Sequence, residues 1–132
     1  MATVESKIIT ALTDYVDGHI WPLSKPAEEN PDTFIVFKPE LLAPEDYGDD
    51  EDLEWLAYMQ IHWYAKGHAD PNPAKRAICT ALKRAGFTIE SIPVSEYESE
   101  NGSSAQGIQT GWTHVCILAN IPEDEAYGEY DD

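Results

Sequence analysis

The stretch Glu54–Lys66, which reads EWLAYMQIHWYAK, carries the strongest strand signal in the chain. Its side chains alternate between two sets, and a period of two residues is typical of a β-strand. One set is Trp55, Ala57, Met59, Ile61, Trp63 and Ala65. The other set is Leu56, Tyr58, Gln60, His62, Tyr64 and Lys66. The first set is wholly apolar and the second is mixed, so we expect a sheet with one core face and one chemically varied face.

A helix and another strand follow this segment. Asn72 can cap a helix that has Pro73 in its first turn, and Gly86 is typical of a helix end. The apolar stripe of this helix is Ala74, Ala77, Ile78, Ala81, Leu82 and Ala85. Residues 87–97 then read as a strand, in which Pro93 indicates an edge position or a bulge.

The ends of the chain supply the remaining elements. Thr3 to Val16 reads as a helix that Gly18 ends, with an apolar side formed by Val4, Ile8, Leu12, Tyr15 and Val16. The run from Phe34 to Phe37 is of strand type, and we expect Pro39 to end it. A short extra strand is possible near Trp21. Residues 110–121 form the closing strand, with Val115, Ile117, Ala119 and Ile121 on one face.

The order of these elements is α-β-β-α-β-β. It predicts an α/β (α+β) domain in which two helices pack on one face of a roughly four-stranded, mostly antiparallel sheet. The predicted domain covers residues 1–121, and residues 122–132 form an acidic C-terminal tail.

The 132 residues carry a net charge of −17, and the acidic residues are clustered. Residues 40–54 hold eight of them and residues 122–132 hold six, with no base in either segment. Outside these segments 11 acids face 8 bases, so the folded body is nearly balanced. The clusters argue against direct binding of nucleic acid, which needs a basic surface. They are compatible with solubility alone or with a functional acidic surface, such as Asp49, Asp50, Glu51 and Asp52.

No catalytic motif stands out. The chain has no phosphate loop, GxGxxG or GxSxG pattern, and its two cysteines have no metal-ligand spacing. Residues two apart on a strand, such as His114 and Cys116, share a face without the geometry of a nucleophile–base pair. The acidic run does not fit the EF-hand pattern. We therefore expect no enzyme activity, no cofactor and no metal site, and the absence of a signal peptide or membrane span predicts a cytoplasmic protein.

The mixed face of the sheet is the best candidate for a partner interface. Two helices can cover only one face, and the other face would expose an unusually apolar surface for a monomer. Its candidate residues are Tyr58, His62, Tyr64, Trp112, His114 and Leu118. A polar segment after residue 97, including Glu98, Glu100, Asn101 and Gln106, is a second candidate, because a mobile loop can become ordered on docking.

The layout from residue 53 to residue 121 resembles the tail terminator and tail completion (head–tail joining) proteins of long-tailed bacteriophages. The resemblance lies in the strand AYMQIHWYAKG, the helix PAKRAICTALKRAGF with its Gly86-Phe87 ending, and the closing strand GWTHVCILANI with His114 and Leu118. It implies a structural virion protein that forms a hexameric ring. The implied partners are further copies of the chain, the tail tube protein and the head connector or stopper protein, and DNA passes through the ring without specific binding.

Two alternatives remain open. One is an acidic decoy that mimics DNA and inhibits a host nucleic-acid enzyme, although its carboxylates would have to be spaced rigidly. The other is an acidic binding module or small enzyme on a ferredoxin-like sheet.

The implied location of the ring subunit is the head–tail junction of the virion, after synthesis in the host cytoplasm.

Overall fold

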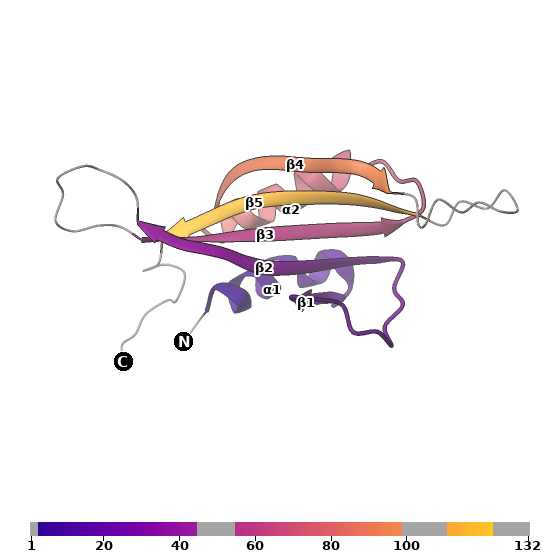
Figure 1. Ribbon diagram of the computed structural model, residues 1–132, viewed down its shortest axis with the longest axis horizontal. Coiled ribbons are helices and arrows are strands. Elements are labelled where there is room, and N and C mark those ends of the chain that lie inside the picture. Colours follow the sequence, from indigo (N-terminus) through magenta and orange to yellow (C-terminus); the bar gives the residue numbers. More distant parts are fainter. Residues whose placement is uncertain (1–2, 45–54, 99–110, 123–132) are drawn as a thin grey trace, which may run out of the picture.

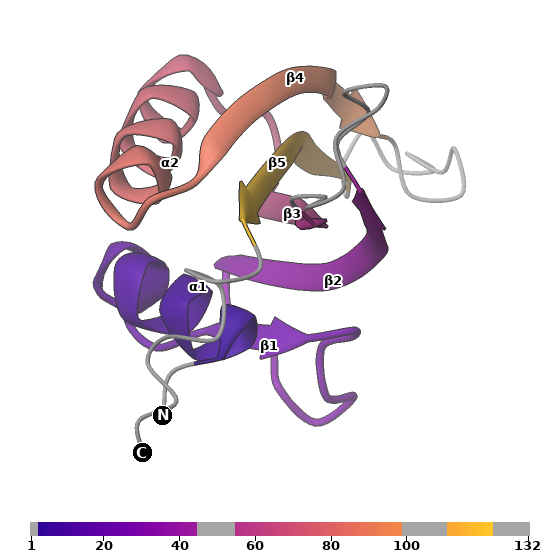
Figure 2. The ribbon, with the colours of Figure 1, turned by 90° about the vertical axis from the view of Figure 1, so that its left-hand side faces the viewer.

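The computed structural model describes residues 3–44, 55–98 and 111–122. Its elements are α1 (Val4–Leu12), a 3₁₀ helix (Thr13–Val16), β1 (Ile20–Pro22), β2 (Thr33–Pro44), β3 (Trp55–Lys66), α2 (Asn72–Arg84), β4 (Thr88–Glu98) and β5 (Trp112–Pro122). Figures 1 and 2 show both helices against the same face of a curved sheet. The α+β class and the one-sided helices agree with the sequence prediction.

The sheet has five strands in the order β1-β2-β3-β5-β4. The possible strand near Trp21 is β1, and it pairs with β2 in parallel. The other pairs are antiparallel. The expected count of about four strands is therefore too low, and the sheet is mixed because the chain returns through residues 23–32 and pairs β2 in parallel with β1.

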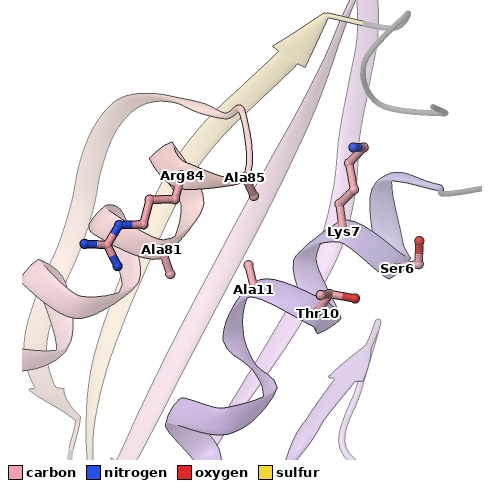
Figure 3. Close-up of a pocket in the computed structure, with 7 residues that line it drawn as sticks. All are labelled: Ser6, Lys7, Thr10, Ala11, Ala81, Arg84 and Ala85. Carbon is pink, nitrogen blue, oxygen red and sulfur yellow. The ribbon is translucent and has the colours of Figure 1, made fainter. Parts of the chain in front are cut away.

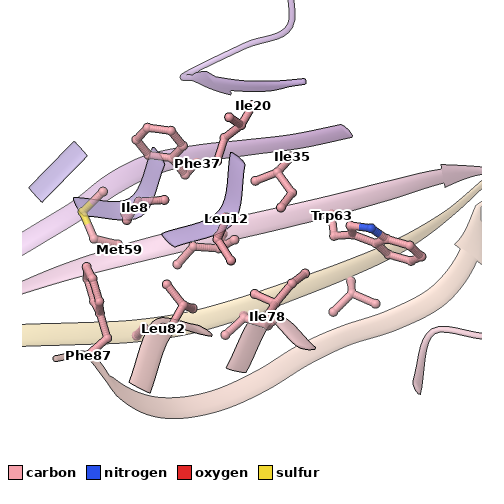
Figure 4. Close-up of a cluster of buried hydrophobic side chains, with 14 of the residues drawn as sticks. Ile8, Leu12, Ile20, Ile35, Phe37, Met59, Trp63, Ile78, Leu82 and Phe87 are labelled. Carbon is pink, nitrogen blue, oxygen red and sulfur yellow. The ribbon is translucent and has the colours of Figure 1, made fainter. Parts of the chain in front are cut away.

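The buried face of the sheet and the two helices form one core. The apolar set of β3 from Ala57 to Ala65 lies in this core with Val115, Ile117, Ala119 and Ile121 of β5, as the alternation predicts. The helices contribute Val4, Ile8, Leu12, Ala74, Ile78 and Leu82. Figure 4 shows Leu12 and Leu82 pointing from their helices toward the strands. Each fully buried aliphatic side chain stabilises the fold by roughly 1.5–3 kcal/mol.

Pro39 does not end β2, contrary to the sequence prediction. The strand continues to Pro44, and its pairing with β3 shifts between Pro39 and Leu41. Proline is tolerated at such an irregularity because no ladder hydrogen bond is required from its nitrogen there. Glu40, which the sequence placed in an acidic loop, consequently lies in the strand.

The predicted helix ends need two corrections. The last turn of the first helix tightens into the 3₁₀ helix, which shifts the helical phase and leaves Tyr15 43% exposed instead of in the apolar stripe. Asn72 is the first residue of α2 and does not cap it with its side chain. Instead, the backbone N–H of Asn72 donates to the Asp70 carboxylate at 3.0 Å. The predicted glycine at the end of α2 is confirmed, since Gly86 has a φ of 103°.

The edge position predicted for the strand that contains Pro93 is confirmed. β4 lies at the end of the strand order, and its pairing with β5 shifts between Ile89 and Ser91 and again between Ser91 and Val94. An edge strand needs partners on one side only, so Pro93 removes no hydrogen bond from the sheet interior.

Replacing Leu82 by alanine tests the core position of α2. The side chain is fully buried, so Leu82→Ala should lower the free energy of unfolding by about 2–5 kcal/mol. Thr80 lies exposed on the same helix and Thr80→Ala should change it by less than about 0.5 kcal/mol. Chemical denaturation of both variants measures the difference, and equal stabilities would contradict the packing of α2.

Candidate functional site

The candidate site lies on the face of the sheet away from the two helices. Side chains there come from four neighbouring strands, because residues two apart on a strand share a face and the antiparallel register places the strands side by side. Opposite pairs include His62 with Cys116 and Tyr64 with His114, both between β3 and β5. The two central strands thus bring two histidines and a tyrosine together.

A chain of hydrogen bonds crosses this face from β4 to β2. The Nδ1–H of His114 donates to Glu98 Oε2 at 2.7 Å. The Nε2 of His114 is 2.8 Å from the Nδ1 of His62, and the Nε2 of His62 is 3.0 Å from the amide oxygen of Gln60. The amide nitrogen of Gln60 donates to Glu40 Oε2 over a longer 3.5 Å. We call these five residues the histidine network.

One proton position in the histidine network follows from its β4 end. The Glu98 carboxylate can only accept, so His114 Nδ1 carries a proton. The short contact between His62 Nδ1 and His114 Nε2 is a hydrogen bond in which the tautomers decide which nitrogen donates. Hydrogen bonds to an ionised carboxylate are short and roughly twice as strong as neutral ones.

Burial keeps His62 neutral. Loss of contact with water lowers the pKa of His62 to about 4, and the nearby charges of His114 and Lys38 act in the same direction against the opposing effect of Glu98. A positive charge on His62 is therefore unfavourable above this pH. The network lies between two carboxylates, those of Glu98 and Glu40, and it is rigid because nearly every polar atom has a partner.

Aromatic rings surround the histidine network. The ring of Tyr64 stacks on His114 with centroids 4.5 Å apart and an interplanar angle of 3°, and on Phe34 at 5.0 Å. Trp112 meets Phe34 edge-on at 5.4 Å. Such pairs add about 0.5–1.5 kcal/mol each beyond their buried area. This packing buries Phe34 and His114 and leaves Tyr64 and Trp112 partly exposed.

A hollow of about 270 Å³ opens beside the network between β2, β3 and the connection after β1. Its lining includes His62, Tyr64, Phe34, Lys25 and Lys38. At its rim Leu23 is 64% exposed and has a φ of 71°, a left-handed conformation that costs a non-glycine residue roughly 1–2 kcal/mol. Backbone strain of this kind tends to occur at sites where a side chain must be presented in one direction.

The arrangement is poorly suited to nucleophilic or metal chemistry. Cys116 Sγ lies 3.9 Å from His62 Nε2, which is closer to a nucleophile–base pair than the sequence indicated. The thiol is buried, however, and burial together with Glu40 raises the pKa of Cys116, so it stays protonated. Within residues 3–44, 55–98 and 111–122, no three His, Cys, Asp or Glu side chains are placed to hold a metal ion. No helix in the described part of the chain is long and apolar enough to span a bilayer.

The structure brings together most of the residues predicted as a partner interface. His62, Tyr64, Trp112 and His114 belong to the network or its aromatic surround. Tyr58 and Leu118 lie further along the same face, both partly exposed.

The other predicted sites are described only in part. Glu98 does not begin a loop as expected, because it is the last residue of β4 and its carboxylate is held by His114. Glu100, Asn101 and Gln106 lie outside the described residues, as do Asp49, Asp50, Glu51 and Asp52.

Sequence reasoning missed the contributions of Gln60, Glu40 and Glu98 to the network. Alternation placed Gln60 and His62 on one face, but the contact between His62 and His114 depends on the register of two strands about 50 residues apart in the chain. Glu40 was missed because the sequence predicted that the strand ends at Pro39, which placed Glu40 outside the sheet.

Comparison with known proteins does not identify the chain. No protein-family model matches the sequence. No curated protein matches it significantly either.

The depressed pKa of His62 predicts a specific pH dependence of stability. Between pH 6.5 and pH 4 the unfolded chain binds a proton at His62 that the folded protein does not bind. The contribution of His62 to stability should therefore be lost as the pH drops through this window, and it should level off below about pH 4. His62→Asn should reduce this loss by about 1–2 kcal/mol, allowing for solvent screening of a half-buried group.

The measurement is urea denaturation of both proteins at several pH values from 4 to 7. Tyr64→Phe is the matched control, because it keeps the stacked ring and should retain the wild-type pH dependence. Parallel curves for wild type and His62→Asn would show that His62 ionises equally in both states.

Proposed function

We propose that this chain is a structural subunit of the head–tail junction of a long-tailed bacteriophage, a tail terminator or a neighbouring head–tail joining protein. In this role it forms a ring, hexameric by the sequence resemblance, that caps the tail tube and joins it to the head connector. The protein has no catalytic task in this proposal, and its site is a contact surface.

The observation that carries the proposal is the helix-free face of the sheet. It presents a band of partly exposed Tyr58, His62, Tyr64, Trp112 and Leu118. Tyrosine and tryptophan are enriched in interfaces, where a large rigid ring contributes area and its polar group still finds a partner. The histidine network fixes this surface before binding, which reduces the entropy lost on association.

A closed ring also needs a second, different patch on each subunit, because head-to-tail contacts pair unlike surfaces. Exposed apolar side chains outside the band supply candidates, among them Tyr15 at the end of the 3₁₀ helix and Trp55 at the start of β3. The 270 Å³ hollow next to His62 could accept one such side chain, and Leu23 at its rim would extend the contact.

The charge of the chain fits a passage for DNA. A ring through which DNA slides is best lined by surfaces that repel phosphate, and the acidic clusters of residues 40–54 and 122–132, which carry most of the net charge of −17, would supply such a surface. The same charge opposes specific binding of the DNA. The remaining proposed partners are the tail tube protein on one side of the ring and the head connector or stopper protein on the other.

Introducing charge on the helix-free face tests the ring. The double variant Tyr58→Asp/Leu118→Asp should leave a folded monomer and abolish rings, because two buried carboxylates cannot be solvated at a contact surface. Light scattering after size-exclusion chromatography and negative-stain electron microscopy measure assembly of the wild type and the variant, alone and with tail tubes.

The control for this experiment is Thr80→Asp, an added charge on the exposed side of α2 that should leave assembly unchanged. If the wild type forms no ring even in the presence of tail tubes, or if the double variant assembles normally, the proposed interface is wrong.

Neutralising the acidic run separates the ring subunit from a DNA-mimicking inhibitor. In a ring subunit, changing Asp49, Asp50, Glu51 and Asp52 together to Asn or Gln should leave assembly and tail length normal, because a run of like charges repels itself and contributes little to stability. In an inhibitor the same change would abolish binding. Infectivity and tail length measure the first outcome, and tight, salt-sensitive capture of a host nuclease or polymerase by the wild type alone would contradict the ring subunit.

A further inference from the structure

A groove of about 610 Å³ runs between α1 and α2 on the outer side of the helix layer. Its walls are short side chains, Ser6, Thr10 and Ala11 from α1 and Ala81 and Ala85 from the second helix and its end. Two cationic residues, Lys7 and Arg84, complete the lining (Figure 3). The groove therefore combines an apolar floor of methyl groups with positive charge at its borders.

Helix α2 is a concentrated basic surface in an acidic protein. It carries Lys75, Arg76, Lys83 and Arg84, half of the eight basic residues of the chain, and no acidic residue. Neither these side chains nor Lys7 forms an ion pair within the described part of the chain. Because the chain has a net charge of −17, these basic side chains without an ion pair are available to bind an acidic partner.

The C-terminal segment 123–132, EDEAYGEYDD, has the complementary composition. It contains six acidic residues, no base, and two tyrosines at positions 127 and 130. A tyrosine ring fits a groove lined by methyl groups, because short side chains leave room for its faces. The carboxylates would then lie near Lys7 and Arg84.

The segment also starts in the right place. It follows Pro122 at the end of β5, and Figures 2 and 3 show this end of the strand at the same end of the helix layer as Lys7 and Ala85. Ten residues in extended form span up to roughly 33 Å. Helix α2 and its end line the groove only through Ala81, Arg84 and Ala85, about one helical turn or roughly 6 Å, so the segment is long enough to follow the groove.

We propose that the acidic C-terminal segment 123–132 binds in the groove between α1 and α2 of its own chain. Carboxylates of the segment pair with Lys7 and Arg84, and Tyr127 or Tyr130 packs on Ala11, Ala81 and Ala85. Binding covers Lys7 and Arg84, and its loss exposes these two cations to another acidic partner. The proposal is independent of the ring function.

The acidic run 45–54 is the alternative occupant of the groove. The way each segment is attached to the fold favours the C-terminal segment. Residues 45–54 connect β2 to β3 and are tied at both ends to central strands. The C-terminal segment is tied at one end only, so it can align with the groove without closing a loop.

Truncation provides the test. The methyl ¹H–¹³C resonances of Ala11, Ala81 and Ala85 should shift when residues 123–132 are deleted. Adding the peptide EDEAYGEYDD to the truncated protein at low salt should restore the original positions, and 0.5 M NaCl should reverse the effect because the contact is electrostatic at its borders. Unchanged methyl resonances on truncation would overturn the proposal.

Charge reversal identifies the groove. In the truncated protein, Lys7→Glu/Arg84→Glu should weaken binding of the peptide by at least about tenfold. The matched control is Lys38→Glu/Lys66→Glu, which changes the net charge equally on two exposed strand residues and should weaken binding by less than about threefold. Equal weakening of peptide binding by both double variants would show that the effect comes from overall charge. That result would contradict binding of the segment in the groove.

Two further outcomes would assign the groove to another occupant. If the full-length methyl positions survive truncation but change when the acids of residues 45–54 are neutralised, the internal acidic run occupies the groove. If sedimentation shows that full-length protein dimerises while the truncated protein stays monomeric, the tail binds a second copy. Either result contradicts binding within one chain.

Discussion

The register between β3 and β5 is the constraint on which the remainder of the structure depends. Eleven residue pairs, from Leu56 opposite Pro122 to Lys66 opposite Trp112, fix these central strands. Because side chains alternate with a period of two, a slip of one residue would move Met59 and Ile61 out of the core and bring Gln60 and His62 into it. The same register places His62 within hydrogen-bonding distance of His114. One pairing therefore fixes both the core and the candidate site.

Much of the fold could be predicted from the sequence because its signals are local. The alternation of Glu54–Lys66 has the period of a strand, and the apolar stripe of α2 has the period of a helix. Both sets of apolar side chains pack into the core, so the pattern predicts the element and its buried face. Pro39 was misjudged because a proline ends a strand only where its missing N–H is needed, and here the pairing shifts beside it. The parallel placement of β1 and the contact of Asp70 with the backbone of Asn72 depend on turns that composition does not specify.

The candidate site was less predictable, because its contacts are not local. The sequence identified the face and six of its residues, since alternation assigns faces whatever the register. It could not reveal the chain from Glu98 through His114 and His62 to Gln60, which joins residues from separate strands. It likewise gave no sign that Cys116 would approach His62, because this contact crosses from one strand to the next.

The histidine network explains why such a surface can exist on the exposed side of a sheet. Isolated histidines among tyrosines would each need water, and a binding partner would have to remove that water at a cost of several kcal/mol. Here each imidazole nitrogen already has a partner, and His114 is paired with the carboxylate of Glu98. A partner can therefore cover the face without removing water from polar groups that have no other hydrogen-bond partner. The paired polar groups of the network are therefore compatible with the proposed contact surface.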